Sequence, residues 1–277
     1  MKKFNPQNSN SGFTLLELIV VIAVVGVGMA MLSSGLARSG HDVQTTLCLS
    51  SKRQMGMAWR LYSDDNTDRL APNYPLGGDS AATPSWAAGL LDYTSSSDNT
   101  NIDLLINHAR YSFSAFLGAY VKTPAVFKCP ADQSVAFPGG KIQNRVRSIS
   151  LNNFVGNNAQ TFAGTISRFP LLKKHSDIAR PSLVFTFLDE REDSINDGAF
   201  YTNPDIVYQM VDFPGSYHGN GCSFVFADNH TELHRWRDPR TMPILKPPVE
   251  LLLNVNLPGD ADILWIAQHT VGVTTYP

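Results

Sequence analysis

The sequence has no marked charge bias. Of its 277 residues, 22 are Lys or Arg and 24 are Asp or Glu, which gives a net charge of −2. A nucleic-acid-binding surface usually shows as an excess of basic residues, so this near-balance gives no electrostatic reason to expect a nucleic-acid partner. Hydrophobic residues make up 43% and charged residues 17% of the chain, so a folded core can form and wholesale disorder is excluded.

Motifs for catalysis are also missing. The sequence has no Gly-x-Ser-x-Gly elbow, no Cys–His arrangement with local support and no Walker-type glycine-rich loop. Acidic residues are plentiful, but none is paired on an identifiable scaffold, so nothing points to glycoside hydrolysis by two carboxylates. We therefore expect a protein that is not an enzyme, with no catalytic residue and no cofactor.

Only one apolar run reaches the length of a bilayer. From Phe13 to Leu32 almost every residue is Leu, Ile, Val, Ala, Gly or Met, and about 20 such residues suffice for one helical pass. No second run of this kind follows. Because Lys2 and Lys3 precede the run, we expect the N-terminus to stay in the cytoplasm and the rest to lie across the membrane.

Glu17 is the one charge within this run, near its start. An acidic side chain costs roughly 2.5–3.5 kcal/mol at the centre of a membrane helix and less near an end. A simple membrane anchor has no use for it, so we expect Glu17 to have a partner.

The stretch from Gly12 to Leu18, Gly-Phe-Thr-Leu-Leu-Glu-Leu, resembles the prepilin peptidase site of type IV pilins and type II secretion pseudopilins. The resemblance implies a leader of residues 1–12, cleavage after Gly12 and N-methylation of Phe13. It also implies that Glu17 pairs with the free amine of a neighbouring subunit during assembly. The alternative, a plain signal anchor, leaves both Gly12 and Glu17 unexplained.

A second resemblance lies near the other end of the chain. His218 and Asp228 are separated by nine residues, as in the His-x9-Asp-Gly signature of prepilin-like proteins abundant in Planctomycetes and Verrucomicrobia. Asn229 stands in place of the glycine but tolerates the same turn conformation. We interpret His218 and Asp228 as structural residues.

Two groups of side chains have the residue types that bind metals, but their positions in the sequence do not fit a metal site. His230 and His234 lie near His218 and Asp228 in the sequence, yet residues four apart on a strand lie about 13 Å apart and cannot grip one ion. Asp64, Asn66 and Asp68 have the first spacings of a calcium loop, but Arg69 and Pro75 occupy positions that need glycine and glutamate. We therefore expect the histidines to be structural and the acidic segment to be a solvated helix stop.

The three cysteines, Cys48, Cys129 and Cys222, leave two alternatives. In an oxidising periplasm two of them can pair, and we favour a Cys48–Cys129 disulfide that ties the end of the long helix to the globular part. The alternative is three buried thiols that behave as small apolar residues.

The predicted fold is α+β and pilin-like, with one long N-terminal helix packed on a mainly antiparallel sheet. Residues 13–32 are its transmembrane part, residues 33–63 its periplasmic half, and residues 64–277 the globular domain. The spacing of Val43, Leu47, Met55, Ala58 and Tyr62 predicts a buried stripe on the second half of the helix, with Lys52 among the polar residues between them.

Within the globular domain, the pattern of apolar and turn-forming residues predicts the remaining elements. In its first half we expect a loop over 71–101 held down by Trp86, a helix over 102–120 and a short strand at 126–129. Strands follow at 146–151 and 183–188, the second of them central in the sheet, and then a solvated acidic run at 189–193. The last elements are a hairpin of 222–226 and 231–236 and an irregular segment 239–277, with short buried elements at 251–253 and 263–267.

The resemblance implies a structural subunit of the bacterial inner membrane that joins a type II secretion or type IV pilus-like filament. Its implied partners are the prepilin peptidase, other pilin or pseudopilin subunits, the inner-membrane assembly platform and the lipid bilayer. The alternative is a membrane-tethered periplasmic binding or enzymatic domain that uses a pilin-type leader. A pocket with convergent polar groups near His218 or the 71–101 loop would favour that alternative.

Overall fold

A computed structural model describes residues 14–121, 123–156, 161–162 and 165–275, and within helix α1 the side chains of 28–41 are not described. The chain is α+β and divides into two compact units, residues 1–43 and 44–277. The predicted leader 1–12, including Gly12, and Phe13 lie outside the described residues.

The first unit contains the start of helix α1, which runs from Leu15 to Asp65. The carboxylate of Glu17 accepts hydrogen bonds from the backbone N and the Oγ1 of Thr14, both at 2.9 Å, while the Glu17 backbone N donates to Thr14 Oγ1 at 3.2 Å. This reciprocal pair is a capping box, which satisfies backbone donors that a helix start leaves unpaired. Thr14 and Glu17 thus define where α1 begins.

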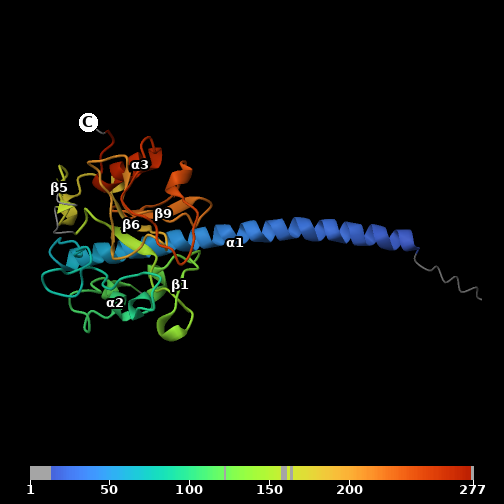
Figure 1. Ribbon diagram of the computed structural model, residues 1–277, viewed down its shortest axis with the longest axis horizontal. Coiled ribbons are helices and arrows are strands. Elements are labelled where there is room, and N and C mark those ends of the chain that lie inside the picture. Colours follow the sequence, from blue (N-terminus) through green and yellow to red (C-terminus); the bar gives the residue numbers. More distant parts are fainter. Residues whose placement is uncertain (1–13, 122, 157–160, 163–164, 276–277) are drawn as a thin grey trace, which may run out of the picture. The chain divides into compact units, whose positions relative to one another are not determined.

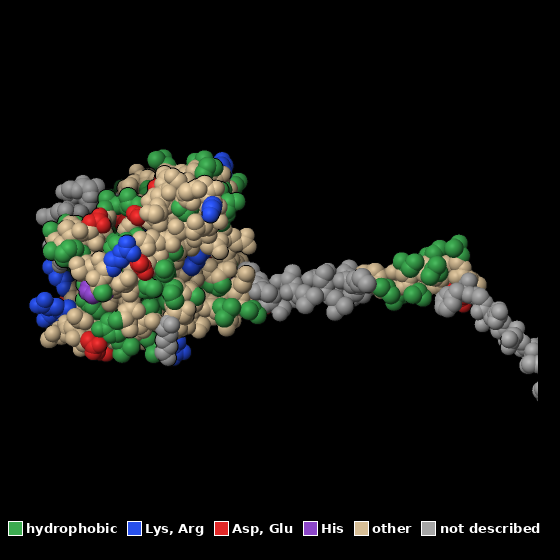
Figure 2. Space-filling model, turned by 90° about the horizontal axis from the view of Figure 1, so that it is seen from below, with side chains coloured by type: hydrophobic (Ala, Val, Ile, Leu, Met, Phe, Trp, Pro, Cys, Tyr) green, Lys and Arg blue, Asp and Glu red, His purple; other side chains and the backbone are tan. Residues whose placement is uncertain are grey.

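Large apolar side chains cover the first turns of α1 (Figure 2). Ten of them between positions 15 and 27 are 47–77% exposed: Leu15, Leu16, Leu18, Ile19, Val20, Val21, Ile22, Val24, Val25 and Val27. A search of the described residues finds no helix with the length and apolar character needed to cross a membrane. The predicted span 13–32 includes Phe13 and the side chains of 28–32, which are outside the described part.

The second unit is built around a five-stranded sheet with the order β10-β9-β6-β3-β7. All neighbouring strands are antiparallel except β3 and β7, which are parallel. The central position of β6 agrees with its uniformly apolar sequence. The strands are β3 (Ile149–Asn152), β6 (Phe185–Asp189), β7 (Ala199–Phe200), β9 (Gly221–Phe226) and β10 (Thr231–Arg235).

Each face of this sheet is covered by a helix (Figure 1). On one face, Met55 and Trp59 of α1 join a buried cluster with Phe187 of β6. On the other, α3 (Ala261–Val271) packs Ile263 and further side chains against a cluster that includes Phe224. Successive residues of a strand point to opposite faces, which divides the apolar residues of β9 between two cores. In β6 a register shift between Phe185 and Phe187 places these two side chains in different cores.

Gly56 allows α1 to approach the β9–β10 hairpin closely. A Cβ atom at this position would lie 2.3 Å from Asn229 Oδ1 and 2.7 Å from Val225 Cγ2. Such contacts are shorter than packed atoms tolerate, so any larger residue requires the side chains of Asn229 and Val225 to shift.

Several predicted elements are confirmed. The hairpin forms with Asn229 at φ 69°, the left-handed conformation that its signature position requires. Helix α1 ends at Asp65, and Thr67 and Asp68 follow with positive φ values. Trp86 is buried in the predicted loop region, where its Nε1 donates to the carbonyl of Gly198 at 2.8 Å.

The predicted helix over 102–120 is wrong. Only α2 (Asp103–Ile106) and the 3₁₀ turn η2 (Gly118–Tyr120) are helical, because the chain folds back on itself between them. Ser114 Oγ donates to the carbonyl of Leu104 at 3.0 Å, and a Cβ on Gly118 would lie 2.3 Å from the carbonyl oxygen of Ile106. The apolar spacing therefore reflects packing of a folded loop rather than one face of a helix.

Two further predictions need correction. The expected strand at 126–129 begins as a 3₁₀ turn, η3 (Pro124–Phe127), because Thr123 caps it and Pro124 fixes its first residue. In the C-terminal segment, α3 begins at the N-cap Asp260 and ends at Gly272 with φ 72°. The expected buried element at 251–253 forms no helix or strand, but Leu251 and Leu253 are partly buried against the second core while Leu252 between them is 81% exposed.

The other elements are short. The antiparallel pairs are β1 (Val135–Ala136) with β2 (Gln143–Asn144), β4 (Thr161–Phe162) with β5 (Thr165–Ile166), and β8 (Gln209–Met210) with β11 (Val255–Asn256). The remaining 3₁₀ turns are η1 (Ser97–Asn99), η4 (Pro138–Gly140), η5 (His175–Asp177), η6 (Pro181–Leu183) and η7 (Pro239–Thr241).

Candidate functional site

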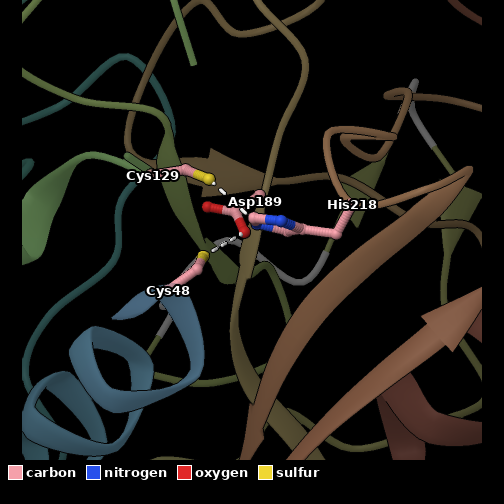
Figure 3. Close-up of side chains that lie close together, drawn as sticks. All are labelled: Cys48, Cys129, Asp189 and His218. Carbon is pink, nitrogen blue, oxygen red and sulfur yellow. Dashed lines mark hydrogen bonds between the residues drawn. The ribbon is translucent and has the colours of Figure 1, made fainter. Parts of the chain in front are cut away.

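Four buried side chains from distant parts of the second unit meet beside α1. They are Cys48 of α1, Cys129 just after η3, Asp189 at the end of β6 and His218 in the turn before β9. One sulfur, oxygen or nitrogen atom of each lies within 4.8 Å of the others. Figure 3 shows the four side chains pointing toward one another.

Helical and strand periodicities place the acidic part of this cluster. Cys48 and Lys52 lie one turn apart on α1, and Asp189 faces them because it lies two residues after Phe187 on the same face of β6. Asp189 Oδ2 lies 3.1 Å from Cys48 Sγ, and Asp189 Oδ1 lies 2.5 Å from Lys52 Nζ. The carboxylate is thus held between a sulfur and an ammonium group.

The buried stripe of α1 differs from the predicted one. Met55 and Ala58 are buried as expected, but Val43 and Leu47 are exposed, and Cys48 and Lys52 occupy the buried face instead. Lys52 is inside because Asp189 provides the counter-charge that a buried ammonium needs.

In the acidic run 189–193 every residue except the half-buried Glu192 is likewise buried, contrary to the prediction that the run is solvated. Glu190 accepts hydrogen bonds from Ser150 Oγ at 2.6 Å and Ser194 Oγ at 2.9 Å. Burial raises the pKa of Glu190 to about 8. Arg191 pairs with Asp193 at 2.5 Å. The buried acidic groups of this run are therefore hydrogen-bonded or paired within the fold instead of solvated.

Hydrogen bonds also fix the other half of the cluster. The Cys129 backbone N donates to Ser148 Oγ at 2.8 Å, and Cys129 Sγ lies 3.1 Å from His218 Nε2. The second ring nitrogen, Nδ1, lies 3.2 Å from Thr45 Oγ1 on α1. Both nitrogens of His218 are therefore directed by side chains from other segments.

Cys48, Cys129 and Cys222 are all buried free thiols. The predicted Cys48–Cys129 pair is brought together, but its disulfide is not formed in this structure. The hydrogen bond from Cys129, together with the nearby Lys52 ammonium, lowers the pKa of Cys48. The same sulfur–sulfur contact and burial raise the pKa of Cys129. The two cysteines therefore differ in acidity, with Cys48 the better thiolate.

The structure separates the two residues of the predicted His-x9-Asp signature. Strand β9 lies between His218 and Asp228, and its six residues at about 3.3 Å each place them about 20 Å apart. Asp228 instead accepts hydrogen bonds from the backbone N and Nδ1 of His230, at 3.1 and 2.6 Å. Asp228 shapes the hairpin turn, whereas His218 belongs to the buried cluster.

The other candidate ligands are engaged elsewhere. The ring of His234 stacks on Trp265 with centroids 3.7 Å apart. Asp64 pairs with Arg60 at 2.8 Å, and Asp68 accepts a hydrogen bond from Ser176 Oγ at 2.5 Å.

A solvent-facing hollow of about 660 Å³ lies at the end of α1. Charged side chains of Asp65, Arg69, Lys173 and Lys174 line it, and Pro72 is its one lining residue from the 71–101 loop. It is not part of the buried cluster around His218.

The comparisons with known proteins bear on the N-terminal segment. Residues 7–33 match the family model of the prokaryotic N-terminal methylation motif, which is consistent with a type IV pilin-like or pseudopilin-like protein. The motif is the kind that prepilin peptidase recognises and pilin subunits carry, and it fits a membrane-anchored or envelope-associated protein. The comparison with curated proteins gives no match, and neither does the comparison with solved structures.

Proposed function

We propose that this chain is a structural prepilin or pseudopilin subunit that is cleaved after Gly12, methylated on Phe13 and assembled into a type II secretion or type IV pilus-like filament. The observation that carries the proposal is the methylation motif at residues 7–33. The role is structural rather than enzymatic, with the prepilin peptidase and the inner-membrane assembly platform as processing and assembly partners.

The exposed apolar start of α1 supports this proposal. A helix that is apolar on all sides is covered either by lipid or by other chains. Ten exposed large apolar residues between positions 15 and 27 form such a surface. The subunit first sits in the inner membrane through residues 13–32, with its C-terminal domain in the periplasm, and the same surface later contacts neighbouring subunits in the filament.

Glu17 supplies the specificity that this apolar surface lacks. Its side chain is exposed and is held at the helix start by Thr14. Association of apolar helices in lipid gains little from the hydrophobic effect, so polar contacts have a large share in setting the register. Cleavage after Gly12 creates a cationic amine on Phe13, which is the partner that Glu17 of an adjacent subunit requires.

The second unit supports the pilin-like interpretation of the fold. Met55 and Trp59 of α1 pack against the same face of the five-stranded sheet. The helix thereby acts as the spine of the globular domain, and a pull on that helix is transmitted to the sheet.

Substitution of Glu17 tests the assembly role. In cells that carry the assembly machinery, Glu17→Val should insert into the membrane and lose its leader as wild type does, but fail to crosslink into filaments. Asp64→Asn is the matched control, because it removes a carboxylate from the same helix outside the apolar segment. Normal filament incorporation of Glu17→Val would refute the assembly role.

A further inference from the structure

The buried cluster has the donor atoms of a metal centre. Two thiols, a carboxylate and an imidazole are all common ligands of zinc. Tetrahedral bonds of about 2.0–2.3 Å place neighbouring ligand atoms about 3.3–3.8 Å apart. Cys48 Sγ lies 3.1 Å from Asp189 Oδ2, Cys129 Sγ lies 3.1 Å from His218 Nε2, and all four donors lie within 4.8 Å of one another. Small side-chain shifts are therefore enough to surround one ion.

Contacts behind two of the four donors, Asp189 and His218, orient them as a metal site requires. Lys52 Nζ engages Asp189 Oδ1, so that Oδ2 faces the sulfur of Cys48. Thr45 Oγ1 lies beside His218 Nδ1, so that Nε2 faces the sulfur of Cys129. Hydrogen bonds to the far side of a ligating carboxylate or imidazole are the usual means of fixing metal ligands.

The charges of the cluster also balance around a divalent cation. Two thiolates and the Asp189 carboxylate carry three negative charges, while a divalent ion and the Lys52 ammonium carry three positive charges. Neutral His218 leaves the sum at zero, which a buried site needs because net charge is costly away from water. Binding of the ion displaces the two thiol protons to solvent.

We propose that Cys48, Cys129, Asp189 and His218 form a closed, structural zinc site. Thiolate ligands favour zinc over magnesium and calcium, and the four protein ligands leave no open position for a substrate. The ion joins α1 to three other segments of the second unit, namely the segment after η3, the end of β6 and the turn before β9 (Figure 3). The site does not depend on processing of the N-terminus.

Metal analysis of the full-length chain, purified in detergent without chelators, tests this site. Inductively coupled plasma mass spectrometry should find about one zinc per chain. Cys129→Ala and His218→Ala should lower zinc affinity by at least about tenfold. Cys222→Ala is the matched control, since it removes another buried thiol whose sulfur bonds the backbone carbonyls of Asp189 and Ser223 and none of the four proposed donor atoms. It should retain zinc.

Cobalt binding by the wild-type protein tests the site even if the variants fail to fold. Zinc-depleted protein given Co²⁺ should develop thiolate-to-cobalt absorption and the visible bands of a tetrahedral ion, and removal of the metal should lower the unfolding temperature. The proposal is overturned if wild type holds neither zinc nor thiolate-bound cobalt, or if intact mass shows a Cys48–Cys129 disulfide. It is also overturned if Cys222→Ala loses zinc as fully as Cys129→Ala.

Discussion

Lys52 and Asp189 form a buried ion pair between α1 and β6, with Nζ 2.5 Å from Oδ1 and side chains 1% and 0% exposed. Burial opposes the charged form of Lys52, but the Asp189 carboxylate and the neighbouring sulfurs outweigh it and raise the pKa of this lysine. Each charge is therefore kept inside the fold by the other, and this contact anchors the helix to the sheet.

Lys52→Met should destabilise the second unit by about 3–5 kcal/mol, because it leaves the Asp189 carboxyl buried without its partner. Chemical denaturation followed by circular dichroism measures the change. Arg60→Met is the matched control on the same helix. This substitution breaks the ion pair of Arg60 with Asp64, two side chains that are 44% and 49% exposed. It should lower the free energy of unfolding by about 0.3–0.5 kcal/mol. Equal, small effects of the two substitutions would contradict the role of the buried pair.

Gly56→Ala should also destabilise the fold, even though alanine favours helices. The new Cβ would press on Asn229 and Val225 of the hairpin, and such overpacking costs about 1–3 kcal/mol. Met57→Ala, at an exposed position next to it, should change the free energy of unfolding by less than about 0.5 kcal/mol. A stabilised Gly56→Ala variant would show that α1 does not approach the hairpin closely.

His269 should make stability depend on pH. Burial lowers its pKa below the ordinary 6.5; Glu232 opposes this shift, whereas His234 and His230 add to it. The unfolded chain therefore takes up the proton first as the pH falls, so the free energy of unfolding should decline below about pH 6.5. His269→Phe keeps a ring against Trp265 and should flatten this decline below about pH 6.5. Thermal unfolding at several pH values measures it, and an unchanged slope in the variant would exclude His269 as the cause.

Local signals were sufficient to predict much of the fold. The uniformly apolar residues of β6 indicated a central strand, and Asn229 indicated a turn position with positive φ. The sequence predicts only a short buried element at 263–267 where α3 forms, because the five prolines that precede it within 239–277 favour irregular structure. Its own boundary residues, Asp260 as N-cap and Gly272 as C-cap, carried the signal that was needed.

The buried cluster could be predicted only in part. The sequence indicates a pairing of Cys48 with Cys129 and a special role for His218, but its local pattern groups that histidine only with Asp228, His230 and His234. The charged residues that follow Asp189 predict a solvated run, whereas its burial depends on docking of α1, more than 130 residues earlier in the chain. The spacing of Cys48 and Lys52, one helical turn apart, was the available hint that a charge lies on the buried face.

Mass spectrometry of the mature N-terminus, on protein isolated from membranes that contain prepilin peptidase, tests the central claim most directly. The account predicts a chain that begins at Phe13 with a methylated amine. A chain that retains residues 1–12 would contradict it, because the charged partner proposed for Glu17 would not exist.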